Sequence, residues 1–594
     1  MCGIFAVIND ESLFGAEGAY EGLKRLEYRG YDSWGIAVQK NHRIELMKEV
    51  GKISSLKKFN GLSKARTAIA HTRWATTGGV TRANAHPHLS TDKSFVLAQN
   101  GIVENYEELK QNLIKRGYRF VSETDTEVIV RQIEEESKTS KNFINAVRTA
   151  FHKLEGRNTI IILTNITDEI IAARNGSPLV VGFNEKTNKV YVSSDVLSFA
   201  PWADKMIVLE NGQLVHVVKN KIKIYDLLSG KEIRYRFEKV QIKSDKVDKE
   251  GYPHFMLKEI NESPTVIQQL TKQEKKHYEE LAKQIRQSTH VYCIGSGTAG
   301  CAAAQMAFYL REIAGITTTA LVGADARDYY GLFKKTDLII APSQSGETAD
   351  VLEVLEFAHK KKIKIASFVN MPGSMMTRLS DYKFMSQAGP EICVLSTKVF
   401  VSQLAWSYLV AKTVKESFEA GLKELLALSS IMQRYLSDSK TVEVIKQLSR
   451  RLLPKRDIFL LGKYQNFQIM KEGMVKLIEG TYKHAHAIPA GDLKHYAITL
   501  MEKGVPVIAA LSNDKVRNDV VNAINEVKAR GAEVIGLSPK SHKSFDFFLQ
   551  VPDLGETQAI MNIIPLQLLA YYLSLDLGHN IDKPRNIAKS VTVK

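Results

Sequence analysis

Short apolar runs separated by turn dipeptides dominate the first 237 residues. Examples of these runs are Ile4–Ile8, Phe95–Asn100 and Thr159–Thr164. Asn175-Gly176 and Asn211-Gly212 mark two of the turns. Short apolar runs bounded by Asn and Gly are typical of strands. The pattern predicts stacked antiparallel sheets with a few helices over residues 1–237.

From about residue 285 the pattern changes to an alternation of strand, loop and helix. Strands are expected at His290–Ile294, Asp337–Pro342 and Ile363–Asn370, and again at Asp457–Gly462 and Pro506–Ser512. Such alternation predicts parallel sheets flanked by helices.

The second half contains an internal repeat. Aligning Asp337–Gly346 with Val505–Asp514 gives two similar units at a period of roughly 165 residues, which indicates a duplicated domain. A helical stretch, about Val399–Leu448, joins the two copies. The charged segment Lys243–Gly251 has no apolar period and is expected to be a linker. The expected divisions are a first domain at 1–237, a linker with connecting helices at 238–284, α/β domains at 285–425 and 426–583, and a tail at 584–594.

Composition narrows the class of protein. Of 594 residues, 44% are hydrophobic and 25% are charged, which fits a globular chain. The net charge of +16 comes without a long run of like charges, a zinc-finger spacing or an aromatic-basic RNA signature, so no nucleic-acid partner is expected. The longest apolar stretch, Ile563–Leu575, is too short to span a bilayer and contains Gln567, so no membrane partner is expected.

Cysteine usage points to a reducing compartment. The 4 cysteines form no CxxC pair, which argues against a disulfide scaffold and a structural zinc site. The N-terminal residues lack the basic and apolar regions of a signal peptide. A cytoplasmic location is expected.

Cys2 brings two reactive groups together once Met1 is removed. The thiol is a nucleophile, and an α-amine with an unperturbed pKa of about 7.7–8.0 can act as its base. Attack on the side-chain amide of glutamine releases ammonia and needs an oxyanion hole. Asn100-Gly101, at the end of an expected strand, offers a side-chain amide and a turn N–H for that role. The alternative for an isolated cysteine is an inert one.

The segment Ser343–Thr348 follows an apolar strand and opens a helix. Hydroxyls and backbone N–H groups at a helix N-terminus form an anion cradle, although the same residues can act simply as N-caps. The loop Gly295–Gly300 lacks a downstream acidic partner at the right place, which makes a dinucleotide site the weaker alternative.

One expected helix and the turn after it carry further candidates. Glu472, Lys476 and Glu479 fall at i, i+4 and i+7 and share a helical face. The alternative is a row of surface ion pairs. His495 follows Lys494 in a turn, where a surface histidine is the default.

Motifs in the first half occur together and carry a resemblance. They are Cys2-Gly3-Ile4, Arg29-Gly30-Tyr31-Asp32-Ser33, Thr72-Arg73-Trp74-Ala75-Thr76, Asn84-Ala85-His86-Pro87-His88, Asn100–Asn105 and Ser122–Glu127. With these motifs the first half resembles class II glutamine amidotransferase domains, which implies an N-terminal-nucleophile αββα sandwich. The implied roles are Cys2 as nucleophile, Asn100 and Gly101 as oxyanion hole, Arg73 and Thr76 on the glutamine carboxylate, Asp125 on its α-amine, and Trp74 near the exit for ammonia. A guanidinium suits a carboxylate because the two can form paired hydrogen bonds.

The resemblance extends along the whole chain, through Lys249–Met256 to the tail from Asp582 to Lys594. The chain is similar to the glutamine–fructose-6-phosphate aminotransferase (isomerising) family. The implied fold is multidomain, α+β and α/β, with the sandwich followed by two sugar-isomerase (SIS) parallel-sheet domains. The implied enzyme takes glutamine and fructose 6-phosphate, passes ammonia through an internal channel and makes glucosamine 6-phosphate.

The resemblance also implies roles in the second half. Ser343, Gln344, Ser345 and Thr348 would hold the sugar phosphate, Thr298 and Ser396 would line the sugar, Lys589 would form a Schiff base with C2, Glu479 would move a proton between C1 and C2, Lys476 would stabilise charge, and His495 would open the sugar ring. In the family this histidine enters from the partner subunit, so a homodimer is implied. No metal and no cofactor are expected.

Several positions depart from the family pattern. They are Thr77, where histidine is usual, Ala299 beside Thr298, His486 in His484-Ala485-His486, and Tyr496-Ala497 after His495. Most lie near the expected sugar site. They motivate two alternatives, namely a paralogue acting on another sugar phosphate and a sugar-phosphate-binding regulator. No ATP-pyrophosphatase loop and no phosphoribosyltransferase loop is found.

Overall fold

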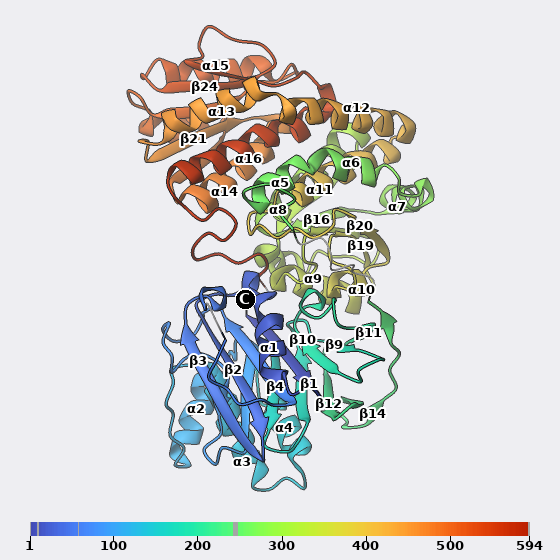
Figure 1. Ribbon diagram of the computed structural model, residues 1–594. Coiled ribbons are helices and arrows are strands. Elements are labelled where there is room, and N and C mark those ends of the chain that lie inside the picture. Colours follow the sequence, from blue (N-terminus) through green and yellow to red (C-terminus); the bar gives the residue numbers. More distant parts are fainter. Residues whose placement is uncertain (1, 9–10, 57–58, 241–247, 592–594) are drawn as a thin grey trace. The chain divides into compact units, whose positions relative to one another are not determined.

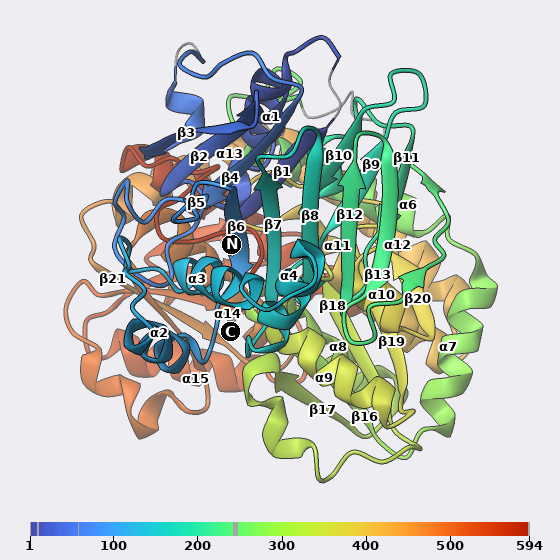
Figure 2. The same ribbon diagram turned by 90° about the horizontal axis from the view of Figure 1, so that it is seen from below.

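The computed structural model describes residues 2–8, 11–56, 59–240 and 248–591 (Figures 1 and 2). They divide into two compact units, one of residues 1–247 with 590–594 and one of residues 248–589. Most of the expected linker Lys243–Gly251 and the last three residues of the tail lie outside the described residues.

The first unit contains two antiparallel sheets. One comprises β1 Gly3–Ile8, β2 Ser33–Lys40, β3 Arg43–Val50, β4 Thr67–Arg73, β9 Val180–Phe183, β10 Val190–Ser193, β11 Lys205–Val208 and β15 Glu238–Lys239, in the order β15-β11-β9-β10-β1-β4-β2-β3. The other comprises β5 His88–Leu89, β6 Phe95–Gly101, β7 Asn158–Thr164, β8 Glu169–Asn175, β12 Gln213–Val218, β13 Lys221–Asp226 and β14 Glu232–Ile233, in the order β14-β13-β12-β8-β7-β6-β5.

Alternation along the strands explains how these sheets stack. On β1, Ile4 and Ala6 join a core with residues of β7 such as Ile161, whereas Phe5 packs on the opposite face with helix α1 Gly15–Lys24. On β7, Ile160 faces helices α3 Asp125–Ser137 and α4 Phe143–His152. Because strand side chains alternate between faces, apolar residues on both faces produce helix, sheet, sheet and helix layers. The expected αββα sandwich is confirmed.

The second unit contains two parallel sheets. The first has β16 Val291–Gly295, β17 Thr318–Val322, β18 Leu338–Ser343, β19 Lys364–Val369 and β20 Tyr382–Met385, in the order β17-β16-β18-β19-β20. The second has β21 Asp457–Gly462, β22 His484–Pro489, β23 Pro506–Ala510, β24 Glu533–Ser538 and β25 Phe547–Gln550, in the order β22-β21-β23-β24-β25. Numbered within each sheet, both orders are 2-1-3-4-5, a doubly wound arrangement that places ligands at the carboxyl ends of strands.

Helices cover these sheets and join them. They are α5 Phe255–Asn261, α6 Ser263–Leu270, α7 Lys275–Gln287, α8 Gly297–Ala314, α9 Ala349–Lys360, α10 Met375–Leu379, α11 Lys398–Val414, α12 Phe418–Ser437, α13 Ser439–Leu452, α14 Phe467–Thr481, α15 Arg517–Lys528 and α16 Gln558–Asp576. A boundary at 425/426 falls inside α12. The segment Gly555–Asp576 is long and apolar enough to cross a membrane, but 89% of its apolar window is buried, so it is a core helix.

Candidate active sites

Cys2 lies immediately before β1, an interior strand of the first sheet. Its Sγ accepts a hydrogen bond from the Trp74 amide at 3.3 Å, and its carbonyl accepts from Asn100 Nδ2 at 3.0 Å and from Arg29 Nε at 3.3 Å. Burial raises the pKa of the Cys2 thiol, and the Trp74 amide and the Arg73 charge oppose that rise. The thiol therefore needs a nearby base to become a nucleophile.

No role was expected for Arg29 from its place in the sequence. Its Nη1 lies 3.1 Å from Asp195 Oδ2, and the Tyr28 hydroxyl donates to the same oxygen at 2.5 Å. This network fixes the guanidinium that holds the Cys2 carbonyl. Arg29 belongs to the motif Arg29–Ser33, but its partner Asp195 is far away in the sequence, so the sequence does not indicate this contact.

Asn100 and Gly101 end β6. Gly101 has φ +136°, and a Cβ there would lie 2.1 Å from the carbonyl oxygen of Arg157. Only glycine fits this position. The structure thus places the Asn100 side-chain amide on the Cys2 carbonyl, with Gly101 next to it at the end of β6, and the oxyanion role of the two residues stays a prediction.

Arg73 and Asp125 come to the same site from different elements. Arg73 ends β4, and its Nη2 and Nη1 donate to the carbonyls of Thr77 at 2.6 Å and Gly79 at 3.1 Å. Asp125 begins α3 and accepts from the Val103 amide at 2.8 Å. Burial raises the pKa of Asp125, whereas the Val103 amide and the Arg73 charge lower it.

Two other residues expected at the glutamine site, Thr76 and Trp74, are less buried than Arg73 and Asp125. Thr76 is exposed on the loop after β4. Trp74 is half-buried and packs edge-on against Tyr31, with ring centroids 5.9 Å apart.

His71, His86 and His88 form a buried cluster. The motifs in the sequence include His86 and His88 but not His71, and none of the three had an expected role. The ring centroids of His71 and His86 are 4.3 Å apart and those of His86 and His88 are 5.1 Å apart. Burial lowers the pKa of His71 to about 3 and holds the pKa values of His86 and His88 well below the usual range. The three imidazoles are therefore neutral.

The histidine cluster joins the elements that carry the glutamine site. His71 Nε2 lies 2.9 Å from the Gln99 carbonyl on β6, and His88 Nε2 lies 3.0 Å from Thr124 Oγ1 at the start of α3. Thr126 Oγ1, on α3, lies 3.0 Å from His86 Nε2. Asn100, Arg73 and Asp125 are thus held on one framework of hydrogen bonds.

In the second unit, the loop between β18 and α9 contains the expected phosphate residues. Ser343 Oγ accepts from the Gly346 amide at 2.9 Å, and Ser345 Oγ accepts from the Glu347 amide at 3.1 Å. Gln344 lies between the two serines, and Thr348 is the residue before the helix. A serine hydroxyl that accepts one hydrogen bond can donate another, so local capping and anion binding are compatible at Ser343.

Lys476 is buried between two carboxylates of α14. Its Nζ lies 3.3 Å from Glu472 and 2.5 Å from Glu479, and its side chain is 1% exposed. Thr298, on α8, donates to Glu472 at 3.1 Å and accepts from Lys476 at 3.2 Å. The alternative of a surface row of ion pairs is wrong for this face, because Glu472 and Lys476 are both enclosed.

Burial and the neighbouring Lys476 act on Glu472 in opposite directions. Burial raises the pKa of Glu472 to about 7, and the Lys476 charge offsets part of that rise. The charges of Glu472 and Glu479 outweigh burial at Lys476, whose pKa is raised. The cluster holds a permanent ammonium next to a carboxyl that titrates near neutrality.

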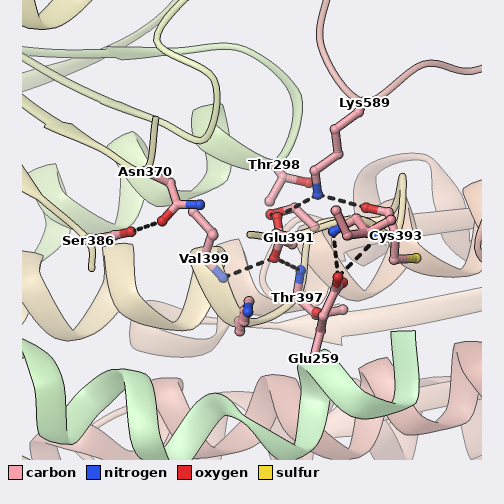
Figure 3. Close-up of polar contacts among 12 residues, drawn as sticks. Glu259, Thr298, Asn370, Ser386, Glu391, Cys393, Thr397, Val399 and Lys589 are labelled. Carbon is pink, nitrogen blue, oxygen red and sulfur yellow. Dashed lines mark hydrogen bonds and ion pairs between the residues drawn. The ribbon is translucent and has the colours of Figure 1, made fainter. Parts of the chain in front are cut away.

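Lys589 lies in the tail and contacts a residue that the sequence did not single out. Its Nζ donates to Glu391 Oε2 at 2.5 Å and to the Cys393 carbonyl at 2.7 Å (Figure 3). Ser396 Oγ donates to the same Glu391 oxygen at 2.9 Å. In the sequence, Glu391 stands out only as a single carboxylate before the apolar run Ile392–Leu395. Nothing in the sequence indicates that it contacts Lys589, nearly 200 residues away.

His495 ends a short 3-10 helix, Leu493–His495, and is exposed. Within the described residues its contact is local, from its backbone amide to the Asp492 carbonyl at 3.0 Å. The structure does not bring His495 to Lys476, Glu479 or Lys589 in one chain.

Comparison with known proteins matches both parts of the chain. The family model of the glutamine amidotransferase domain matches residues 71–200, and the SIS domain model matches residues 284–412 and 451–576. A glutamine–fructose-6-phosphate aminotransferase (isomerizing) of Thermococcus kodakarensis is 36% identical over 609 residues, covering 100% of both chains. One of Clostridium tetani is 36% identical over 618 residues, again covering 100% of both.

A solved structure matches the second unit. The C-terminal domain of glucosamine-fructose-6-phosphate aminotransferase from Francisella tularensis has a TM-score of 0.52 and 29% identity, and covers 57% of this chain and 100% of that chain.

Proposed function

The chain belongs to the glutamine–fructose-6-phosphate aminotransferase (isomerizing) family, and on that premise we propose how its residues divide the reaction. The enzyme uses glutamine to convert fructose 6-phosphate to glucosamine 6-phosphate. Full-length similarity to enzymes of that name carries this conclusion. The roles of individual residues are our proposal.

The glutaminase half-reaction takes place at Cys2. Arg73 and Thr76 bind the carboxylate of glutamine and Asp125 binds its ammonium group. The Cys2 thiol attacks the side-chain amide, and its own α-amine takes the thiol proton after Met1 is removed. Asn100 Nδ2 and the Gly101 amide stabilise the oxyanion. Ammonia then leaves past Trp74 and is carried to the sugar without release to solvent.

The sugar half-reaction takes place in the second unit. Ser343, Gln344, Ser345 and Thr348 bind the phosphate, and Thr298 and Ser396 lie along the sugar. His495 opens the ring, and the Lys589 amine attacks C2 and displaces its oxygen as water, which gives a Schiff base.

Ammonia replaces Lys589 at C2. Glu479 then removes a proton from C1 and returns one to C2, so that the product is an amino aldose. Lys476 stabilises the negative charge that develops during this transfer. No step in this scheme requires a metal or a cofactor.

We also propose a homodimer in the cytoplasm. His495 is exposed and apart from the other sugar-site residues, and the half-exposed Tyr496 and Leu500 follow it. A second copy that covers this surface would supply His495 to its neighbour's site. The proposed divisions of the chain stay as 1–237, 238–284, 285–425, 426–583 and 584–594.

Two variants test the two-site scheme. Cys2→Ala should abolish glutamine hydrolysis and leave glucosamine 6-phosphate synthesis from ammonium and fructose 6-phosphate, measured by mass spectrometry. Cys301→Ala, a buried cysteine of α8, is the matched control and should keep both reactions. Loss of the ammonium-dependent reaction in Cys2→Ala would contradict the scheme, and glutamate release without amino sugar in the unaltered enzyme would point to another sugar phosphate.

A further inference from the structure

Two carboxyls, Glu259 and Glu391, are buried near Lys589, and the reaction described above uses neither of them. The side chains of Glu391 and Lys589 are 0% and 4% exposed, and Glu259 is 2% exposed. Figure 3 shows Glu259 on one side of the segment 391–393 and Lys589 on the other. A buried charged group is costly unless it is paired, so the arrangement calls for an explanation.

Glu391 is held by four donors. Its Oε1 accepts from the amides of Thr397 at 2.9 Å and Val399 at 3.1 Å. Its Oε2 accepts from Ser396 Oγ at 2.9 Å and from Lys589 Nζ at 2.5 Å. Three of the four donors fix the carboxylate, and the fourth is the amine that must lose a proton before it can attack a carbonyl.

Glu259, on α5, has a different setting. Its Oε1 accepts from the amides of Ile392 at 2.5 Å and Cys393 at 3.2 Å. Its Oε2 has no hydrogen-bond partner among the residues that the structure describes. Glu259 thus holds the backbone of the segment that carries Glu391 and makes no contact with the lysine.

The pKa values of Glu259 and Glu391 are shifted in opposite directions. Burial and the charge of Glu391 raise the pKa of Glu259 to about 8. Burial also acts to raise the pKa of Glu391, but the Lys589 charge and the backbone amides outweigh it and the pKa is lowered. At neutral pH Glu259 is mainly a neutral acid and Glu391 is ionised.

Other charged and titratable groups around the pair are already engaged. Lys398 pairs with Glu262 at 2.7 Å, and Asp582 accepts from the amides of Phe255 at 3.0 Å and Met256 at 2.9 Å. The Cys393 thiol lies 3.5 Å from the Ile581 carbonyl, and burial raises its pKa well above the usual range. Glu391 is therefore the carboxylate in hydrogen-bond contact with Lys589.

We propose that Glu391 shuttles the Lys589 proton during Schiff-base formation, whereas Glu259 acts as a positioning residue that holds the backbone of residues 392 and 393. This inference rests on the proposed role of Lys589. Glu391 is a catalytic residue in the strict sense, because it touches the reacting nitrogen.

The step balances with one proton. Lys589 gives a proton to Glu391 and becomes a neutral amine. Its nitrogen lone pair forms a bond to C2 of the open ketose, and the carbonyl oxygen becomes a hydroxyl after taking the proton that the nitrogen releases. Glu391 then returns its proton to that hydroxyl, the C–O bond breaks, and water leaves as the iminium forms. Ionised Glu391 remains as the counter-charge of the iminium.

The test follows capture of the iminium by cyanoborohydride in the full-length enzyme with fructose 6-phosphate. The Lys589 peptide is quantified by mass spectrometry at several pH values between about 6 and 8. In the unaltered enzyme the proton is supplied internally, so the capture rate should change little across this range. In Glu391→Gln the Lys589 proton must leave to solvent before the amine can attack C2, so attack becomes limiting. Capture should slow by about 100-fold at neutral pH and rise about tenfold for each pH unit upward, as the fraction of neutral amine rises.

Two further variants separate a proton shuttle from a structural anchor. Glu259→Gln makes the same chemical change within the same buried cluster, and it should keep most of the capture rate. Glu391→Asp retains a carboxylate, and should be slower than the unaltered enzyme while its rate stays nearly independent of pH. Glutamine hydrolysis at Cys2 should be unchanged in all three and serves as the control for intact protein.

Three results would overturn the inference. They are a Glu391→Gln profile parallel to that of the unaltered enzyme, a Glu391→Asp profile with the steep slope of Glu391→Gln, and a Glu259→Gln loss as large as that of Glu391→Gln. Lys589→Arg separates this inference from the proposed function. If the adduct persists in Lys589→Arg, the Schiff-base residue itself is misassigned.

Discussion

At the scale of single residues, two buried lysines are surrounded differently. Lys476 contacts two carboxylates, Glu472 and Glu479, together with Thr298 Oγ1. Lys589 contacts one carboxylate and one carbonyl. Two carboxylates favour a permanent ammonium, which suits a residue that stabilises negative charge. A single carboxylate can accept the proton of its partner, which suits a lysine that must become a nucleophile.

Substitution of Lys476 tests the first of these settings. Lys476→Met leaves Glu472, which is completely buried, with only the Thr298 hydroxyl as partner. Without the ammonium, burial favours the protonated carboxyl, which then lies in the core with one hydrogen-bond partner, so we expect a loss of about 1–3 kcal/mol in the free energy of unfolding of the second unit. Amino-sugar synthesis should fall at least about 100-fold, while glutamine hydrolysis is unchanged.

Denaturant unfolding and the two separate rate assays check this expectation. Lys471→Met, on the same helix and half-buried, is the matched control and should change stability by less than about 1 kcal/mol. The double variant Lys476→Met with Glu472→Gln should recover stability, because the orphaned carboxyl is gone, but should not recover synthesis. Full synthesis in either variant would show that the ammonium is not used.

Sequence alone predicted the residues whose chemistry is local. Cys2 and the pair Asn100-Gly101 carry recognisable groups at strand ends, and the structure places them together. It missed Glu391 and Arg29, whose functional contacts are made across the fold with Lys589 and Cys2. Such partners share no periodic pattern, since only tertiary packing brings them together.

At the scale of elements, apolar periodicity predicted strands well and helix ends less well. The strand expected at Asp457–Gly462 is present with those limits as β21. The single helical stretch expected over Val399–Leu448 is divided into α11, α12 and α13. Glu416 breaks it with φ +62°, and Asp438 begins α13 by accepting hydrogen bonds from Lys440 and Thr441. These interruptions depend on backbone conformation at one residue, which an apolar pattern does not record.

The loop before α9 provides a test of the proposed phosphate site. Gly346 has φ +66°, and an added Cβ would lie 2.2 Å from Ser374 Oγ and 2.8 Å from Val369 Cγ1. Gly346→Ala should therefore displace the Ser343–Ser345 turn and raise the KM for fructose 6-phosphate by at least about tenfold, with glutamine hydrolysis unchanged. Steady-state kinetics of both half-reactions measure the effect.

Gly373→Ala is the matched control for this loop. Gly373 also has a positive φ, +73°, but no atom lies within 4 Å of its added Cβ. It therefore carries the same backbone strain without a clash, and its KM should rise by less than about threefold. An equal rise in both variants would mean that strain, and not the shape of the cradle, is responsible.

At the scale of the whole molecule, the two parallel-sheet domains share a strand order but not a ligand loop. The first copy has Ser343-Gln344-Ser345 after its third strand in the chain, whereas the second has Ser512-Asn513-Asp514. Asp514 Oδ1 accepts from the Val516 amide at 3.2 Å. A carboxylate before that helix repels a phosphate, so we expect the first copy to be the one that binds it. The duplication was visible in the sequence, whereas this expected difference between the copies depends on the charge at one position.

The two compact units should respond to pH in opposite directions. In the first unit, His71, His86 and His88 stay neutral because burial lowers their pKa values, that of His71 to about 3. The unfolded chain binds protons on these histidines below about pH 6.5, and the folded unit does not. Stability of the first unit should therefore fall as the pH decreases, by about 1.4 kcal/mol per pH unit for each histidine.

In the second unit, stability changes with pH in the opposite direction. Burial raises the pKa of Glu259 to about 8 and that of Glu472 to about 7. Between about pH 4.5 and those values the folded unit keeps protons that the unfolded chain releases. Stability of the second unit should therefore fall as the pH increases.

Differential scanning calorimetry between about pH 5 and 7 checks both signs. We expect one transition whose Tm falls by on the order of 10 °C from pH 6.5 to 5.5 and a second whose Tm rises over the same interval. His88→Gln should reduce the change of the first Tm with pH by the contribution of one histidine. His42→Gln, at an exposed turn of the same unit, should leave that change as it is. Glu259→Gln should flatten the second dependence. Because each substitution alters the proton balance of one unit only, movement of both transitions in the same direction would show that these buried groups do not control the response of the enzyme to pH.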